Sequence, residues 1–238
     1  MALKRPEKTT TEGPRFTPKT LAFLRALKRN NDRDWFRERK DQFDEQVKAP
    51  MVAVIAQLAT DFRAFAPELV ATEKCIYRIY RDTRFSEDKT PLKTHIAASF
   101  PWRGLERHQG AGLYIEVTPK WVWVGGGMYA PATAQLAAVR EHIAANHTHL
   151  RAIVESPGFK KAVGALEGER LQRVPRGFDR DHPAAEYLRH RQFLAGHQFP
   201  AEFACDPGFY RGVLDVYRQI APLVRFLNEP LIGRRALQ

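Results

Sequence analysis

The alternation of apolar and polar residues predicts β-strands in the middle of the chain. Within residues 93–100, Ile96 and every second residue from it lie on an apolar side, whereas Lys93 and His95 lie on the opposite side. This alternation is typical of a half-buried strand. Residues 75–82 have the same character, so we expect the two segments to pair as a hairpin. Further strands are predicted at residues 112–125, where two strands meet around residues 118–120, and at residues 170–174 and 192–199.

Helical periodicity dominates both ends of the chain. The first helix begins after Thr17 with Pro18 at its first position, and Asp32 caps a second helix that runs to residue 49. Further helices are predicted at residues 51–65 and 132–146, after Ser156, from Pro183, and at residues 207–227 with Asp206 as the cap.

These elements predict a single α+β domain over residues 15–230, with a mostly antiparallel central sheet and helices from both ends of the chain packed on it. Strands and helices do not alternate regularly, which argues against a doubly wound fold. Residues 1–14 and 231–238 are predicted to be tails, the first of which lacks the apolar segment of a signal peptide. No run reaches the roughly 18 apolar residues of a membrane span, so we expect no membrane contact.

Charge and cysteine content narrow the class of protein. The 238 residues carry 38 Lys and Arg against 27 Asp and Glu, a formal net charge of +11, which attracts anionic partners. Cys75 and Cys205 are the two cysteines, too few for a disulfide framework and not spaced as zinc ligands. We therefore expect a cytoplasmic protein with no metal and no cofactor. The pattern specifies no oligomeric state.

Three histidines close together in the sequence do not change that expectation. His142, His147 and His149 are offset by five and two positions, so they do not share one face of a helix. No carboxylate or cysteine stands at a supporting interval, as a zinc site requires.

Basic side chains crowd residues 78–93, between two apolar runs. Guanidinium and ammonium groups bind phosphate and carboxylate oxygens through charge-assisted hydrogen bonds. The predicted ligand contacts are Arg78, Arg81, Arg84, Lys89 and Lys93. His95 is the candidate general base, because the surrounding cations favour its neutral form, and Asp82 would orient arginines. The alternative interpretation is a salt-bridged network that only orders the loop.

A second polar segment, R-V-P-R-G-F-D-R-D-H-P, covers residues 173–183. Arg173, Arg176 and His182 are predicted ligand contacts, whereas Asp181 is expected to cap the next helix. Long polar loops in compact domains are often functional. We therefore expect the two polar segments to meet in one electropositive cleft, with Tyr129 and Arg140 at its wall.

Three consecutive glycines, at residues 125–127, precede the helix predicted at residues 132–146. A tight turn with positive φ is the favoured interpretation, and backbone N–H groups approaching an anion at the helix N-terminus is the alternative. Trp121 and Trp123 share one face of the strand before these glycines. We expect them to form core or sheet cover rather than a base-stacking platform, because no basic residue alternates with them.

The run R-I-Y-R-D-T-R-F-S-E-D-K-T-P-L-K-T-H resembles the hallmark of an uncharacterised family of bacterial and fungal proteins built on a domain of unknown function. The segment G-G-G-M-Y-A-P, Arg140 and the second polar segment match the same family, so the resemblance covers residues 16–227. The chain departs from the family pattern at Glu87, where the family has Lys, and at Leu92, where it has Tyr. The resemblance implies kinship and no established activity.

Three functions fit these observations. The first is an enzyme or receptor for a small anionic, phosphate-bearing ligand held by the basic residues named above. The second is a nucleic-acid-binding module that uses a basic stripe. The third is a structural or interaction protein whose polar segments order loops. The sequence specifies no reaction, and Ser86 is the only hydroxyl in the first polar segment that we consider as a nucleophile.

Overall fold

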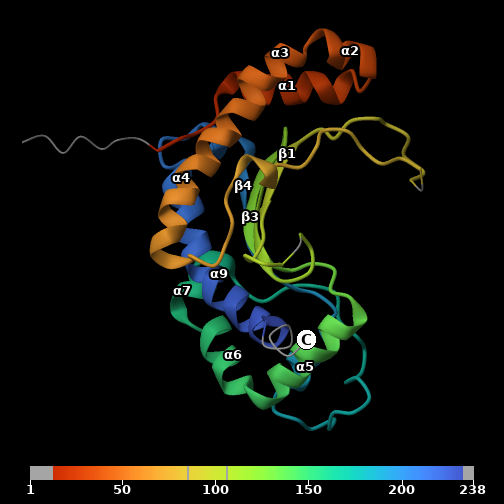
Figure 1. Cartoon of the computed structure of the whole chain (residues 1–238), viewed down its shortest axis with the longest axis vertical. Coiled ribbons are helices and arrows are strands. Elements are labelled where there is room, and N and C mark those ends of the chain that lie inside the picture. Colours follow the sequence, from red (N-terminus) through yellow and green to blue (C-terminus); the bar gives the residue numbers. More distant parts are fainter. Residues whose placement is uncertain (1–12, 85, 106, 233–238) are drawn as a thin grey trace, which may run out of the picture.

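The computed structural model describes residues 13–84, 86–105 and 107–232. Its centre is a four-stranded sheet in the order β1-β2-β3-β4, formed by β1 (Ile96–Phe100), β2 (Gly112–Val117), β3 (Trp121–Met128) and β4 (Phe193–Pro200). All three neighbouring pairs are antiparallel. Helices from both ends of the chain lie on the same face of this sheet (Figure 1). The predicted single α+β domain is therefore confirmed.

The second of the predicted N-terminal helices is divided in the structure. They are α1 (Pro18–Arg29), α2 (Arg33–Glu38), α3 (Lys40–Phe43), the π-helix η1 (Asp44–Lys48) and α4 (Ala49–Phe65). Asp32 caps α2 as predicted, because its side chain accepts hydrogen bonds from the backbone N–H groups of Asp34 and Trp35. The single helix predicted from Asp32 to residue 49 is wrong. Non-helical dihedrals at Arg39 end α2, and η1 then runs without a break into α4.

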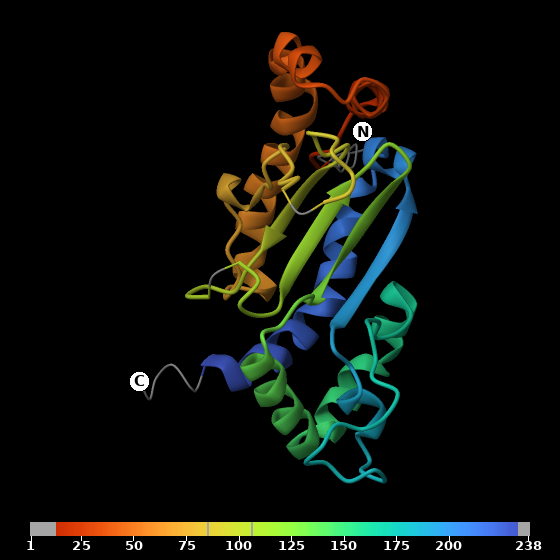
Figure 2. The same cartoon turned by 90° about the vertical axis from the view of Figure 1, so that its right-hand side faces the viewer.

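The C-terminal helix α9 (Phe209–Ile232) crosses the back of the sheet and builds the core with α4 (Figure 2). Tyr217 of α9 is fully buried, and its ring lies 6.1 Å from that of Phe62 in α4 and 6.0 Å from that of Phe100 in β1. The helix is longer than the predicted residues 207–227 and includes residues 231 and 232 of the predicted tail. Residues 1–12 and 233–238 of the two predicted tails lie outside the described residues.

Residues 75–82 do not form the predicted strand. A 3-10 turn, η2 (Glu73–Cys75), includes the first of them, and their backbone pairing with β1 and the following loop consists of the isolated bridges Ile76↔Ala98 and Tyr80↔Leu92. The side-chain amide of Asn31 accepts a hydrogen bond from Leu92 N at 3.0 Å and donates one to Leu92 O at 2.8 Å. The bridge at Tyr80 is held by hydrogen bonds from Arg81 N to Pro91 O and from Lys93 N to Ile79 O, so the Asn31 amide occupies the outward-facing groups of Leu92. The predicted hairpin is thus reduced to an irregular edge.

The glycines at residues 125–127 form neither a turn nor a helix N-terminus. They lie inside β3 and pair with β2 on one side and β4 on the other. Gly127 has a φ of 123°, and a Cβ there would overlap the carbonyl oxygen of Phe193. Glycine is therefore required by the close approach of two strands, and the predicted tight turn is wrong.

The segment between β3 and β4 forms a helical layer at one end of the sheet. It contains α5 (Thr133–Ala145), α6 (His147–Val154), α7 (Pro157–Val163) and the short α8 (Ala185–Leu188). The strand predicted at residues 170–174 is reduced to one isolated bridge, Arg170↔His190. The helix predicted from Pro183 begins later, after Ala184, so Asp181 does not cap it. Among the described helices, none combines the length and the apolar character that a bilayer crossing requires.

Candidate functional site

No described helix covers the face of the sheet that points away from α4 and α9 (Figure 2). A cavity of about 480 Å³ lies on this face. We call it the sheet-face cavity. The strand alternation explains its lining, because Ile96, Ala98 and Phe100 point into the core whereas Lys93, His95, Ala97 and Ser99 point into the cavity. This division of residues 93–100 into two faces confirms the prediction from the sequence.

The lining is rich in aromatic side chains and holds a few polar groups, as small-molecule sites do. Its aromatic and histidine members are Tyr77, His95, Trp102, His108, Tyr114, Trp123 and Tyr129. Its charged members are Lys93 and Glu116, and its glycines are Gly110, Gly112, Gly126 and Gly127.

Two cations lie over one aromatic ring at the β1 edge of the cavity. The ammonium nitrogen of Lys93 is 4.9 Å from the ring centroid of Tyr77, and the guanidinium carbon of Arg107 is 4.5 Å from it. Lys93 lines the cavity, whereas Arg107 lies beside the lining and also donates a hydrogen bond to Lys74 O. Such contacts attract the cation to the face of the ring. The pKa of Lys93 is lowered by burial and then by the charges of Arg78 and Arg107. This edge therefore carries concentrated positive charge that no carboxylate neutralises in an ion pair among the described residues.

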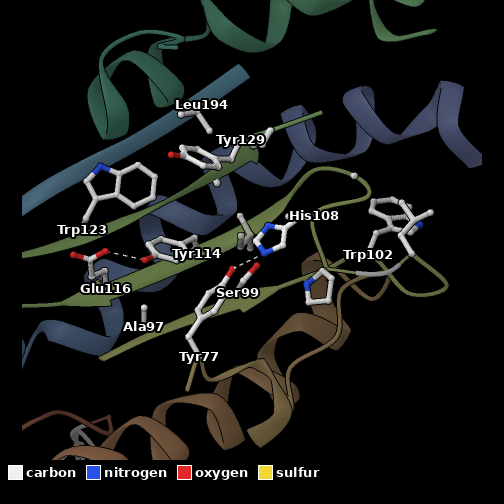
Figure 3. A pocket seen from close by; sticks show the side chains of 18 of the residues that line it. Tyr77, Ala97, Ser99, Trp102, His108, Tyr114, Glu116, Trp123, Tyr129 and Leu194 are labelled. Atoms are coloured by element: carbon white, nitrogen blue, oxygen red, sulfur yellow. Dashed lines mark hydrogen bonds between the residues drawn. The ribbon is translucent and has the colours of Figure 1, made fainter. Parts of the chain in front are cut away.

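The hydroxyl of Tyr77 lies 3.3 Å from Nε2 of His108, which comes from the loop between β1 and β2. Figure 3 shows Tyr77, Ser99 and His108 gathered at this side of the cavity. Burial raises the pKa of Tyr77, so its hydroxyl is protonated at neutral pH and can donate a hydrogen bond. Together these groups supply polar contacts next to the two cations.

The middle of the sheet carries a second polar pair. The hydroxyl of Tyr114 donates a hydrogen bond to Oε2 of Glu116 at 2.8 Å (Figure 3). The pKa of Tyr114 is raised strongly, first by burial and then by the charge and hydrogen bond of Glu116. Tyr114 is therefore a neutral donor that holds the Glu116 carboxylate in place on the cavity floor.

His95 lies on the cavity face of residues 93–100, and its surroundings lower its pKa. Burial lowers its pKa and Lys93 lowers it further, whereas the nearby charge of Glu116 acts in the opposite direction. At neutral pH the imidazole is therefore uncharged, as a general base or a hydrogen-bonding contact requires.

We expect the free energy of unfolding to decrease as the pH falls from 8 to 5. The pKa of His95 and that of the buried His190 are both lowered by burial, whereas an unfolded histidine titrates near about 6.5. The unfolded chain thus takes up protons first, so stability is full above about pH 6.5 and is lost as the pH falls through the lower pKa of the folded state. Urea unfolding at several pH values measures this slope.

A matched pair of variants measures how much of this pH dependence of stability comes from His95. His95→Asn should flatten the slope, whereas His197→Asn, at an exposed position of β4, should leave it unchanged. An unaltered slope in His95→Asn would contradict the assignment.

The remaining predicted contacts of the first polar segment lie outside the sheet-face cavity. Arg81 forms an ion pair with Asp88 and hydrogen bonds with Thr90 and Ser86. Arg84 forms an ion pair with Asp82 at 2.8 Å, and Lys89 donates a hydrogen bond to Thr83 O at 3.0 Å. Arg78 lines a separate open groove beside η1. The loop-ordering interpretation therefore fits Arg81, Arg84 and Asp82. Lys93 and His95 are the members of this segment that reach the cavity.

The two polar segments do not meet. Figures 1 and 2 both place residues 78–93 at one end of the molecule and residues 173–183 at the other. The second segment is held near the start of β4 by the bridges Glu167↔Leu194 and Arg170↔His190, whereas Lys93 precedes the start of β1. The sheet separates these ends, so the single cleft predicted from both segments is wrong.

The predicted residues beyond the first segment have separate positions. Tyr129 lines the cavity. Arg140 donates to His190 O at 2.9 Å in the helical layer, and the ring of His182 lies 5.7 Å from that of His147. Arg173 and Arg176 lie in the same distant loop and do not line the cavity. No group of three His, Cys, Asp or Glu side chains arranged to hold a metal occurs in the described ranges.

Sequence reasoning missed several lining residues. Tyr114 and Glu116 were detectable, because they alternate with the buried Leu113 and Ile115. His108 lines the cavity from an irregular loop, where no periodicity indicates direction, and its neighbour Arg107 lies over Tyr77 outside the lining.

The chain matches a known family. A family model described as "Conserved hypothetical protein (DUF2461)" matches residues 19–226. A comparison with curated proteins gives no match.

Proposed function

The chain belongs to the DUF2461 family of conserved hypothetical proteins, and from the site described above we propose that it binds a small anionic, phosphate-bearing ligand in the sheet-face cavity. The observation that carries the proposal is the pair of cations, Lys93 and Arg107, over the ring of Tyr77 at one edge of a concave, aromatic cavity. Charge-assisted hydrogen bonds from such groups are the strong ones.

The net charge of +11 supports the same proposal at longer range, because excess positive charge raises the local concentration of anions. His95 is the candidate base should the ligand react there, since burial keeps it neutral. The cytoplasmic location stays a prediction drawn from the two cysteines.

Isothermal titration calorimetry with inorganic phosphate, sulfate, nucleotides and short oligonucleotides tests the proposal. We expect Lys93→Met to weaken binding of a phosphate-bearing ligand by about tenfold or more, because a hydrogen bond to a charged group contributes about 1.5–3 kcal/mol. Lys89→Met is the matched control, since it removes the same charge from a side chain that binds Thr83 O outside the cavity.

Three outcomes separate the candidate functions. Binding that depends on Arg84 and not on Lys93 would move the ligand to the loop and contradict the cavity. Binding of oligonucleotides alone, with steep salt dependence, would favour the nucleic-acid module. Failure of every anion to bind would leave the loop-ordering function.

A further inference from the structure

We propose that the ligand is a nitrogen heterocycle joined to a phosphate, of the mononucleotide class, with its ring on Trp123, its N–H edge at Glu116 and its phosphate at Lys93, on the side of the cavity next to Arg107. This inference rests on the proposed function, because it assumes that an anionic group occupies the Lys93 edge. It adds what the rest of the cavity recognises.

The indole of Trp123 presents a flat aromatic surface on the floor of the cavity. Positions Gly125 and Gly196 lie side by side on β3 and β4, and a Cβ at either would overlap the six-membered ring of Trp123. The two glycines thus let the indole lie against the sheet backbone, with its broad side turned to the cavity (Figure 3). Planar bases stack on such a surface whatever their hydrogen-bonding pattern.

The aromatic surface extends from the indole to the cationic edge. The ring centroid of Tyr114 is 5.7 Å from that of Trp123 and 6.2 Å from that of Tyr77, and its plane is tilted by 57° and 59° to theirs. A flat ring that stacks on Trp123 therefore does not stack on Tyr114 as well. Lys93 and Arg107 lie at the Tyr77 end. A ligand that uses both ends therefore needs a flat ring and an anionic group separated by a spacer, as a base, a sugar and a phosphate are. A lone phosphate would leave most of the 480 Å³ unused.

An anionic ligand alone does not explain why the carboxylate of Glu116 lines the cavity. A carboxylate on the floor repels a phosphate, so the part of the ligand that faces it must supply hydrogen-bond donors. Tyr114 uses Oε2 of Glu116, and no donor to Oε1 is found in the described part of the chain. Carboxylates accept N–H groups of base edges, and two adjacent N–H donors, as on a guanine edge, suit the two oxygens best.

Calorimetry with four probes tests the inference: guanosine monophosphate, guanosine, ribose 5-phosphate and inorganic phosphate. We expect guanosine monophosphate to bind at least tenfold more tightly than ribose 5-phosphate, because only the former has a ring for the floor. Trp123→Leu should remove this advantage and leave the affinity for ribose 5-phosphate unchanged.

Glu116→Gln is the variant that tests the N–H edge with little change in shape. It should lower the affinity for guanosine monophosphate by about tenfold. The affinity for ribose 5-phosphate, which has no N–H edge, should not fall. Glu186→Gln, which removes the same charge from α8 outside the cavity, should change neither affinity. Equal losses for both probes in Glu116→Gln would overturn the assigned role of Glu116.

The probes separate failure of the inference from failure of the proposed function. Ribose 5-phosphate or phosphate binding as tightly as guanosine monophosphate, and depending on Lys93, would overturn the heterocycle and keep the anion site. Guanosine binding as tightly as its monophosphate would overturn both the phosphate part of the inference and the proposed function. Absence of binding by all four probes would also overturn both.

Discussion

Gly127→Ala is expected to lower the free energy of unfolding by about 3 kcal/mol, one of the two largest effects predicted for the fold. The φ of 123° lies in a region that side chains rarely adopt, and the new Cβ would overlap the Phe193 carbonyl oxygen of the neighbouring strand. Strain at such a dihedral costs about 1–3 kcal/mol, and forced overpacking adds a similar amount. Urea unfolding followed by far-UV circular dichroism measures the change.

Gly164→Ala is the matched control for backbone strain. Gly164 has a φ of 79°, and a Cβ there has nothing within 4 Å. It should therefore cost only about 1 kcal/mol. Equal losses for the two variants would show that the strands separate slightly to admit the methyl group and that the close approach at Gly127 contributes nothing.

The position of the glycines at residues 125–127 could not be predicted from the sequence. Residues without side chains carry no alternation, so glycines inside a strand and glycines in a turn have the same sequence pattern. The strands on either side of them were predictable, because Leu113, Ile115 and Val117 alternate with polar positions along β2. These glycines form part of a strand because β4, about 70 positions later in the chain, pairs with them.

The candidate site was predictable in part for a similar reason. Alternation correctly placed Lys93 and His95 opposite Ile96, yet it could not show that this face stays uncovered. That outcome depends on α4 and α9 both packing on the other face (Figure 1). Charge density was a poorer guide than periodicity, because Arg81 and Arg84 are engaged by Asp88 and Asp82 of their own loop.

Asn228→Ala is the second large effect, with an expected loss of about 3 kcal/mol. Asn228 is fully buried in α9, where its side chain accepts a hydrogen bond from Ala111 N at 2.8 Å and donates one to Ala111 O at 3.0 Å. Removing the amide leaves both buried backbone groups without this partner, and each such group costs about 1–3 kcal/mol. Urea unfolding measures the loss, and Asn30→Ala, which removes an exposed amide that binds Ala26 O, is the control.

Asn228→Ala should also loosen the loop beside the cavity, because Ala111 is the last residue of the loop that carries Arg107 and His108. Once Ala111 is released, amide hydrogen exchange in residues 107–111 should become faster than in β3, which pairs with a strand on both sides. Affinity for a phosphate-bearing ligand should fall with it, since Arg107 then has to be ordered on binding. Unchanged exchange in residues 107–111 with a full loss of stability would mean that Asn228 supports the core and does not position the loop.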